Sequence, residues 1–270
     1  DRYASVDAYY ADKAHLFDHA AAGSTWVLNG EDEEVLRMAG DAPGRRLLFR
    51  TEGRPAAKEE GGWVEDGVLM LRVQGEDEAI VREDELRLLG GHNRGNALAA
   101  ALAAFAVHDD VVALRDGLRS FPPLRHRLEP LGVVDGVLWV NDSKATNVAS
   151  CRVALESMTR PTILLLGGRH KGESYAGLAD AAPDRLEVVV AYGEAGGRIA
   201  EDLGERVRVE RVEGDLRAVV GRARELAEPG HAVLLAPACA SFDWFTDYAE
   251  RGDSFKHEVQ KLIEVRSRER

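Results

Sequence analysis

The sequence predicts an α/β protein in which the carboxy-terminal half forms a mainly parallel, doubly wound sheet. From Thr146 onward, continuous apolar runs typical of buried strands alternate with segments of helical periodicity, which is the pattern of such a sheet. Several of these runs break abruptly into polar residues, as strands do where they present a binding site. At 270 residues and 45% hydrophobic content, the chain is large enough for one or two domains.

The amino-terminal half mixes helices with a β-hairpin and ends at two adjacent prolines. Asp66 and Gly67 stand between two β-rich runs, which is a two-residue hairpin signal. Pro122 and Pro123 stop the last helix, so we expect one domain over residues 1–123 and a second over 124–270. The predicted elements are a helix within 1–22, a strand at 26–28, a helix at 33–39, a strand at 46–50, a hairpin at 63–71, short strands within 79–89, and helices at 97–107 and 110–121.

The carboxy-terminal half begins with a second hairpin, signalled by Asp135 and Gly136. Its remaining strands are short and apolar, and a helical segment separates each from the next. The predicted elements are hairpin strands at 129–134 and 137–140, helices at 146–158, 175–182, 195–203, 215–228 and 248–265, and strands at 162–166, 188–191, 207–212 and 232–235.

Composition excludes several classes of function. The formal net charge of −12 argues against a nucleic acid or an anionic membrane as the partner. The longest apolar run, 97–107, is too short and too alanine-rich to cross a bilayer. Two cysteines and no visible signal peptide predict a cytoplasmic location. Because the chain starts at Asp1 without a methionine and soon enters a helix, we expect an amino-terminal truncation.

The most informative strand end lies at residues 141–147, Asn-Asp-Ser-Lys-Ala-Thr-Asn. Thr146 or Asn147 can cap the following helix, where free backbone amides favour an anionic ligand. Asp142 and Lys144 add one charge of each sign. A capped surface loop would show the same residue types, so the stretch alone leaves both interpretations open.

Candidate binding residues also follow two other predicted strands and stand at the start of one predicted helix. The run 167–172 places three basic residues beyond a buried strand, but it lacks the G-K-[ST] of a phosphate-binding loop. The run 236–243 is rich in small residues, and its Cys239 has no basic partner in sequence that would make it a nucleophile. Asn93 and Asn96, three residues apart, would share one face of a helix and could hold a base or a water.

These motifs together resemble the Mur ligases, and within that family the branch that adds D-glutamate. The matching stretches are W-V-N-D-S-K-A-T-N, L-L-L-G-G-x-x-K, L-R-H-R-L-E, G-x-H-N-x-x-N and P-A-C-A-S-F-D-x-F-x-x-Y-x-x-R-G. The resemblance covers essentially the whole chain. It implies the back part of the family's central ATPase domain followed by its Rossmann-like carboxy-terminal domain. The phosphate-binding loop and the UDP-binding domain would be missing, so we expect these 270 residues to be inactive alone.

The resemblance also implies the chemistry. Such ligases join D-glutamate to UDP-N-acetylmuramoyl-L-alanine in peptidoglycan precursor synthesis, using ATP and Mg²⁺. The substrate carboxylate accepts the γ-phosphoryl group, and the amine of D-glutamate then displaces phosphate. No nucleic acid, no membrane insertion and a monomeric state are implied.

Site residues follow from the matched motifs. Lys13, which could equally be a surface lysine, matches a carbamylated lysine whose new carboxylate binds Mg²⁺, and so counts as catalytic. The nucleotide side is matched by Asn93, Asn96, His126, Arg127 and Asp142. The D-glutamate side is matched by Lys144, Thr146, Lys171, Ser241, Phe242 and Tyr248, with Thr146 and Lys171 also expected to be catalytic. Phe242 and Tyr248 depart mildly from the family pattern.

Two alternatives remain at this point. A Rossmann-like module could bind a nucleotide or an acidic ligand without turning it over, and the missing phosphate-binding loop favours that function for the chain as it stands. A sister ligase for another amino acid is disfavoured by the stretch N-D-S-K-A-T-N at 141–147 and by Lys171.

Overall fold

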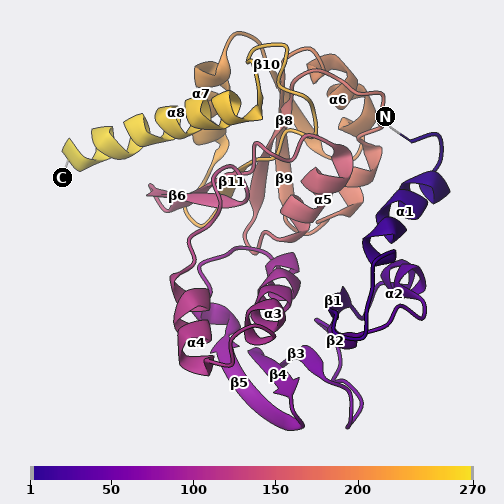
Figure 1. The fold of residues 1–270 in the computed structure, drawn as a ribbon. Helices are drawn as coiled ribbons and strands as arrows, with labels where there is room; N and C mark the ends of the chain where they lie inside the picture. The colour runs from indigo at the N-terminus through magenta and orange to yellow at the C-terminus, as the bar shows by residue number, and fades with distance from the viewer. Residues whose placement is uncertain (1–2, 269–270) are drawn as a thin grey trace. The chain divides into compact units, whose positions relative to one another are not determined.

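The computed structural model describes residues 3–268 and divides into two compact units (Figure 1). The amino-terminal unit comprises the chain up to Arg87 together with Gly91–Pro122. The carboxy-terminal unit comprises Leu88–Gly90 and the chain from Pro123 onward. Each unit contains its own sheet, and none of the described helices is long and apolar enough to cross a membrane.

The amino-terminal unit is a five-stranded sheet in the order β1-β2-β3-β4-β5. The first three strands pair in parallel and the last three antiparallel. The Asp66-Gly67 hairpin is confirmed, with positive φ values of 50° and 74° that a two-residue turn of this kind requires. The elements are α1 (Val6–Ala14), η1 (His15–Phe17), β1 (Thr25–Asn29), α2 (Glu33–Ala39), β2 (Arg45–Phe49), β3 (Gly61–Glu65), β4 (Val68–Val73), β5 (Glu76–Arg82), η2 (Glu83–Glu85), α3 (His92–Phe105) and α4 (Val111–Ser120).

Helix α3 supplies much of the core of this unit. Leu98 and Leu102 on α3 pack with Leu47, Leu69 and Leu71 from the sheet. The helix begins at His92, five residues before the predicted start at residue 97. The prediction missed the first turn because that turn is polar and shows no apolar periodicity. The two asparagines of the G-x-H-N-x-x-N motif therefore lie within the helix and not ahead of it.

The carboxy-terminal unit is a six-stranded sheet in the order β10-β9-β8-β11-β7-β6. All pairs are parallel except β6 with β7, so the mainly parallel sheet is confirmed. The elements are β6 (Glu129–Val134), β7 (Val137–Asn141), α5 (Val148–Glu156), β8 (Thr162–Gly167), η3 (Ala176–Asp180), β9 (Leu186–Tyr192), α6 (Gly196–Leu203), β10 (Arg208–Val212), α7 (Leu216–Leu226), β11 (Ala232–Leu235) and α8 (Tyr248–Arg268).

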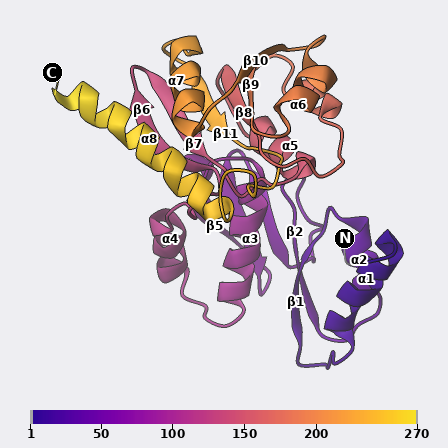
Figure 2. The same ribbon diagram turned by 90° about the horizontal axis from the view of Figure 1, so that it is seen from above.

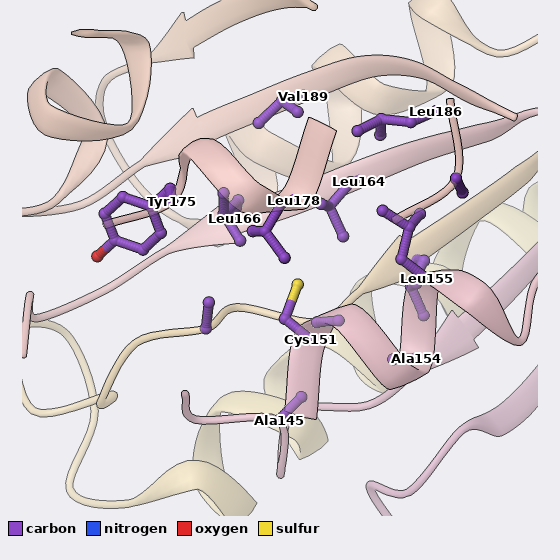
Figure 3. Packing of buried hydrophobic residues seen from close by; sticks show 14 of the residues in the cluster. Ala145, Cys151, Ala154, Leu155, Leu164, Leu166, Tyr175, Leu178, Leu186 and Val189 are labelled. Carbon is purple, nitrogen blue, oxygen red and sulfur yellow. The ribbon is translucent and has the colours of Figure 1, made fainter. Parts of the chain in front are cut away.

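Helices cover both faces of this sheet, as the doubly wound prediction requires (Figure 2). Helices α5 and α6 and the segment η3 pack on one face, where Ile199 of α6 is fully buried. Cys151 and Leu178 are fully buried in the same cluster (Figure 3). Helices α7 and α8 pack on the other face through residues such as Val219 and Phe255. The predicted helix at 175–182 is a short 3₁₀ segment instead, because Gly177 and Pro183 leave too few residues for an α-helix.

Candidate functional site

Three loops follow the carboxyl ends of the neighbouring strands β7, β11 and β8. The chain leaves β7 and β8 toward the face covered by α5 and η3, but it leaves β11 toward the face covered by α8. Loops that diverge to opposite faces mark the position at which doubly wound sheets bind ligands. The polar residues after these strands therefore surround the position where the fold favours a site.

Lys144, in the loop after β7, has its ammonium group held against an aromatic ring. Its Nζ donates to Tyr248 Oη at 3.0 Å and lies 4.4 Å from the centroid of that ring. Within residues 3–266, no carboxylate forms an ion pair with Lys144. The half-buried cation is therefore available to an anionic ligand.

Lys171 lies in the loop after β8, which is tied to its neighbours on both sides. Arg169 exchanges backbone hydrogen bonds of 2.8 and 3.2 Å with Ala240 in the loop after β11. Glu173 Oε2 accepts from the backbone N–H of Val148, at the start of α5, at 3.2 Å. Lys171 itself is exposed, and in the described part of the chain it forms no ion pair. The loop is thus anchored while its lysine stays open to a ligand.

Thr146 and Lys171 follow strands β7 and β8, which are not neighbours in the sheet. Strand β11 lies between β7 and β8. The bond from Val148 to Glu173 nevertheless links the two loops. Asn147 caps α5 by accepting from the backbone N–H of Ser150 at 2.7 Å, so the cap does not occupy the Thr146 hydroxyl.

Arg251 of α8 forms hydrogen bonds with both the loop after β7 and the loop after β11. It is 1% exposed, and its guanidinium donates to Ser143 Oγ at 2.9 Å, Ser143 O at 2.8 Å and Cys239 O at 3.2 Å. Ser143 Oγ in turn donates to the backbone carbonyl of Tyr248 at 2.7 Å. One buried side chain therefore fixes the loops after β7 and β11 to the start of α8.

A second buried network begins at His126. The fully buried Asn141 approaches His126 Nδ1 and donates to Glu129 Oε2, both at 3.1 Å. Glu129 Oε1 accepts from Lys256 Nζ at 2.6 Å. Burial is the main cause that lowers the pKa of His126, so its ring is neutral at pH 7. Arg127, next to it, is exposed.

The loop after β11 carries the remaining predicted residues. Ser241 is 2% exposed, and its carbonyl accepts from the backbone N–H groups of Trp244 and Phe245 in a tight turn. Phe242 is 59% exposed, as several other large apolar side chains of the chain are, and it lies at the surface beside Ser241.

Comparison with known proteins identifies both units. The Mur ligase middle domain matches residues 1–104, and the Mur ligase glutamate ligase domain matches residues 126–239. The chain belongs to the Mur ligase family. The resemblance inferred from the motifs and the α/β fold class are thereby confirmed.

Curated Mur ligases named UDP-N-acetylmuramoylalanine–D-glutamate ligase are similar over almost the whole chain. That of Salinibacter ruber is 39% identical over 265 residues, and that of Myxococcus xanthus is 41% identical over 266. The matches cover 95% and 97% of this chain but only 56% and 58% of those proteins. The chain thus spans little more than half the length of these relatives.

Two solved ligase structures share the fold at low sequence identity. A pseudomurein peptide ligase of Methanothermus fervidus superimposes with a TM-score of 0.66 at 14% identity, covering 96% of this chain and 60% of that one. A MurF ligase of Thermotoga maritima, solved in complex with ADP, gives a TM-score of 0.61 at 14% identity, covering 98% and 60%.

The Mur ligase residues expected in the amino-terminal unit lie on two helices. Lys13 is exposed in the last turn of α1, with Nζ 5.4 Å from the centroid of the Tyr9 ring. Asn96 Nδ2 donates to Asn93 Oδ1 at 3.0 Å on one face of α3, as their spacing predicted. Among the described residues, no group of three or more His, Cys, Asp or Glu side chains could hold a metal ion.

Asp142, expected on the nucleotide side of a Mur ligase site, is half-buried. Burial raises the pKa of its carboxyl group from 3.8 to about 6, against a smaller opposing effect from the backbone N–H of Leu128 and from Arg127. The folded protein therefore keeps an anionic carboxylate at pH 7 in a position that disfavours its charge.

Replacing Asp142 with asparagine is expected to stabilise the carboxy-terminal unit at neutral pH. The pKa of Asp142 is higher in the folded than in the unfolded protein, so the free energy of unfolding of the wild type falls as pH rises from about 4 to about 6. Above about pH 6 the carboxylate is charged in both states, and its full destabilising effect remains. The variant should gain about 3 kcal/mol at pH 7.5 and only about 1 kcal/mol at pH 4.5. Urea unfolding at the two pH values measures the difference, and an equal gain at both would contradict it.

Four residues that hold this site together escaped the sequence analysis. Arg251, Asn141, Glu129 and Lys256 bond to partners up to 127 positions away in the chain. Arg251 is part of the R-G that ends the last matched motif, and it lies three residues after Tyr248. Residues three apart on a helix lie on the same face, so this spacing could have indicated that Arg251 lies beside Tyr248.

Proposed function

We propose that this chain is the larger part of an ATP-dependent ligase that adds D-glutamate to UDP-N-acetylmuramoyl-L-alanine. One observation carries the proposal. Lys144 and Lys171, on loops beside β11, have no acidic partner among the described side chains and are available to a ligand with two carboxylates. The D-glutamate ligases of Salinibacter ruber and Myxococcus xanthus, about 40% identical, support the same choice of amino acid.

The proposed acceptor site consists of donors that leave an amine free to react. D-Glutamate must bind through its carboxylates while its amino group stays unpaired for attack. Lys171 and Thr146 would bind one carboxylate, and Lys144 and Ser241 the other, since ammonium and hydroxyl groups can donate to carboxylates. Tyr248 would orient Lys144, and the exposed Phe242 would cover the ligand.

The proposed domains and nucleotide-binding residues follow from the matched motifs. Residues 1–123 would belong to the central ATP-binding domain and residues 124–270 to the carboxy-terminal ligase domain. Asn93 and Asn96 would bind near the adenine. His126, Arg127 and Asp142 would lie on the ribose side.

Magnesium would depend on Lys13. As a carbamate, this side chain would offer one carboxylate, and Mg²⁺ commonly binds through one or two carboxylates together with substrate phosphates and water. The bound ion would supply charge neutralisation for the phosphates. In this proposal the ligase acts in the cytoplasm as a monomer.

The function is tested by replacing Lys171 with alanine in the complete ligase that contains this chain. Loss of one charge-assisted hydrogen bond costs roughly 1.5–3 kcal/mol, so kcat/KM for D-glutamate should fall by about 10- to 150-fold. The KM for ATP should stay within about threefold, because Lys171 lies on the acceptor side. Steady-state phosphate release measures both.

The matched control is Lys261→Ala. Lys261 is an exposed lysine of α8 paired with Glu258, away from the three loops. It should leave both constants unchanged. A fall in ATP affinity without a change for D-glutamate would make Lys171 a phosphate ligand and would refute the acceptor assignment.

A further inference from the structure

Three side chains form a continuous hydrogen-bonded chain between the loops after β8 and β11. His170 Nδ1 lies 2.9 Å from Tyr175 Oη, and Tyr175 Oη lies 3.0 Å from Cys239 Sγ. Tyr175 is 1% exposed and Cys239 is fully buried, whereas His170 is half-buried at the edge of the loop. Figure 3 shows the Tyr175 ring at the margin of the core, with its hydroxyl turned away from Leu166 and Leu178.

We call His170, Tyr175 and Cys239 the relay, and the Tyr175 and Cys239 groups that form its hydrogen bonds are uncharged. Burial is the main cause that raises the pKa of the Cys239 thiol to about 11, and it also raises the pKa of the Tyr175 hydroxyl. Both groups therefore keep their protons at neutral pH, and Cys239 is not poised as a nucleophile. A phenolic hydroxyl can donate to one neighbour while it accepts from the other, so Tyr175 can bridge the imidazole and the thiol.

The relay spans the two loops that carry proposed D-glutamate ligands. His170 directly precedes Lys171, and Cys239 stands two residues before Ser241. On its far side, the relay loop is held by Asp202 of α6, which accepts from the Tyr175 backbone N–H at 2.8 Å and from Ser174 Oγ at 3.0 Å. The segment around Lys171 is therefore fixed at Tyr175 but exposed between residues 171 and 174.

We propose that His170, Tyr175 and Cys239 are positioning residues that set the place of Lys171 relative to Ser241. The inference rests on the proposed function, because it assumes that Lys171 binds D-glutamate. Without the Tyr175 hydroxyl, His170 loses its buried partner, and the loop keeps Lys171 in a wider range of positions. Binding of the amino acid then weakens, while the chemical step and nucleotide binding stay unchanged.

The test is Tyr175→Phe in the complete ligase. The KM for D-glutamate should rise by about 3- to 10-fold, the effect of one neutral hydrogen bond, while kcat and the KM for ATP stay within about twofold. His170→Ala should give the same rise. His170→Asn should restore the wild-type KM to within about twofold, because an amide can replace Nδ1 as the partner of Tyr175.

Hydrogen exchange supplies a readout that needs no substrate. Backbone amides of residues 168–174 should exchange faster in Tyr175→Phe than in the wild type, and those of β8 should not. The matched control is Tyr192→Phe, which removes the hydroxyl of an equally buried tyrosine at the end of β9, outside the relay. It should change neither exchange in the loop nor the KM.

The outcomes separate this inference from the function on which it rests. If Lys171→Ala impairs D-glutamate use but Tyr175→Phe and His170→Ala leave its KM unchanged, the positioning role is wrong. If Tyr175→Phe speeds loop exchange while Lys171→Ala has no effect on D-glutamate, the assignment of Lys171, and with it the positioning of a substrate ligand, is refuted. Unchanged exchange in Tyr175→Phe would also overturn the inference.

Discussion

Lys13→Ala is expected to nearly abolish turnover of the complete ligase, by roughly 100-fold or more, and short carboxylic acids added to the assay should restore part of it. The expected size is that of losing a group that stabilises transition-state charge. A carbamate supplies a carboxylate that alanine lacks, and a small diffusible acid can replace it. Phosphate release with and without acetate or formate measures both effects.

The experiment distinguishes a catalytic lysine from a surface lysine. Lys13 is exposed and lies over the Tyr9 ring, as an ordinary surface lysine does. Lys58→Ala, which removes another exposed lysine of the same unit, should leave turnover unchanged. Wild-type activity in Lys13→Ala, with or without bicarbonate, would return Lys13 to the class of solvated lysines.

Arg251→Met should reduce the free energy of unfolding of the carboxy-terminal unit by about 3–5 kcal/mol. Methionine has a similar length but leaves two buried carbonyls, of Ser143 and Cys239, without their donor. Each buried acceptor that loses its partner costs about 1–3 kcal/mol. Because two units can unfold separately, amide exchange in β8 and β11 is the suitable measurement.

Arg125→Met provides the comparison within the same unit. Its guanidinium is 66% exposed and pairs with Asp253 at the surface, so its loss should cost less than about 1 kcal/mol. Similar effects of the two substitutions would show that Arg251 contributes no more than a solvated ion pair.

Local signals predicted most of the secondary structure. The Asp66-Gly67 and Asp135-Gly136 turns both occur with the positive φ values that their residues favour. Helix α2 has the predicted bounds, because Asp32 caps it by accepting from two backbone N–H groups. The 3₁₀ segment and the early start of α3 were missed where glycine or polar residues obscure the periodicity.

The site was predictable only as far as single loops. Polar runs after apolar strands pointed to the loops that carry Lys144, Lys171 and Ser241. The position of β11 between β7 and β8 depends on pairing between strands about 70 to 95 residues apart, which no local pattern encodes. The same holds for Arg251, whose acceptor Ser143 lies 108 positions earlier in the chain.

The place of β11 also determines when this sheet can form during synthesis. It is the last strand of the sheet to leave the ribosome, yet it occupies the centre. Until Leu235 has been made, β7 and β8 lack the partner that pairs with both. Pairing between distant segments is slow, and unpaired strand edges promote aggregation. We therefore expect nascent chains that end before β11 to depend on chaperones. Strand β11 should pair with β7 and β8 only while α8 is being synthesised.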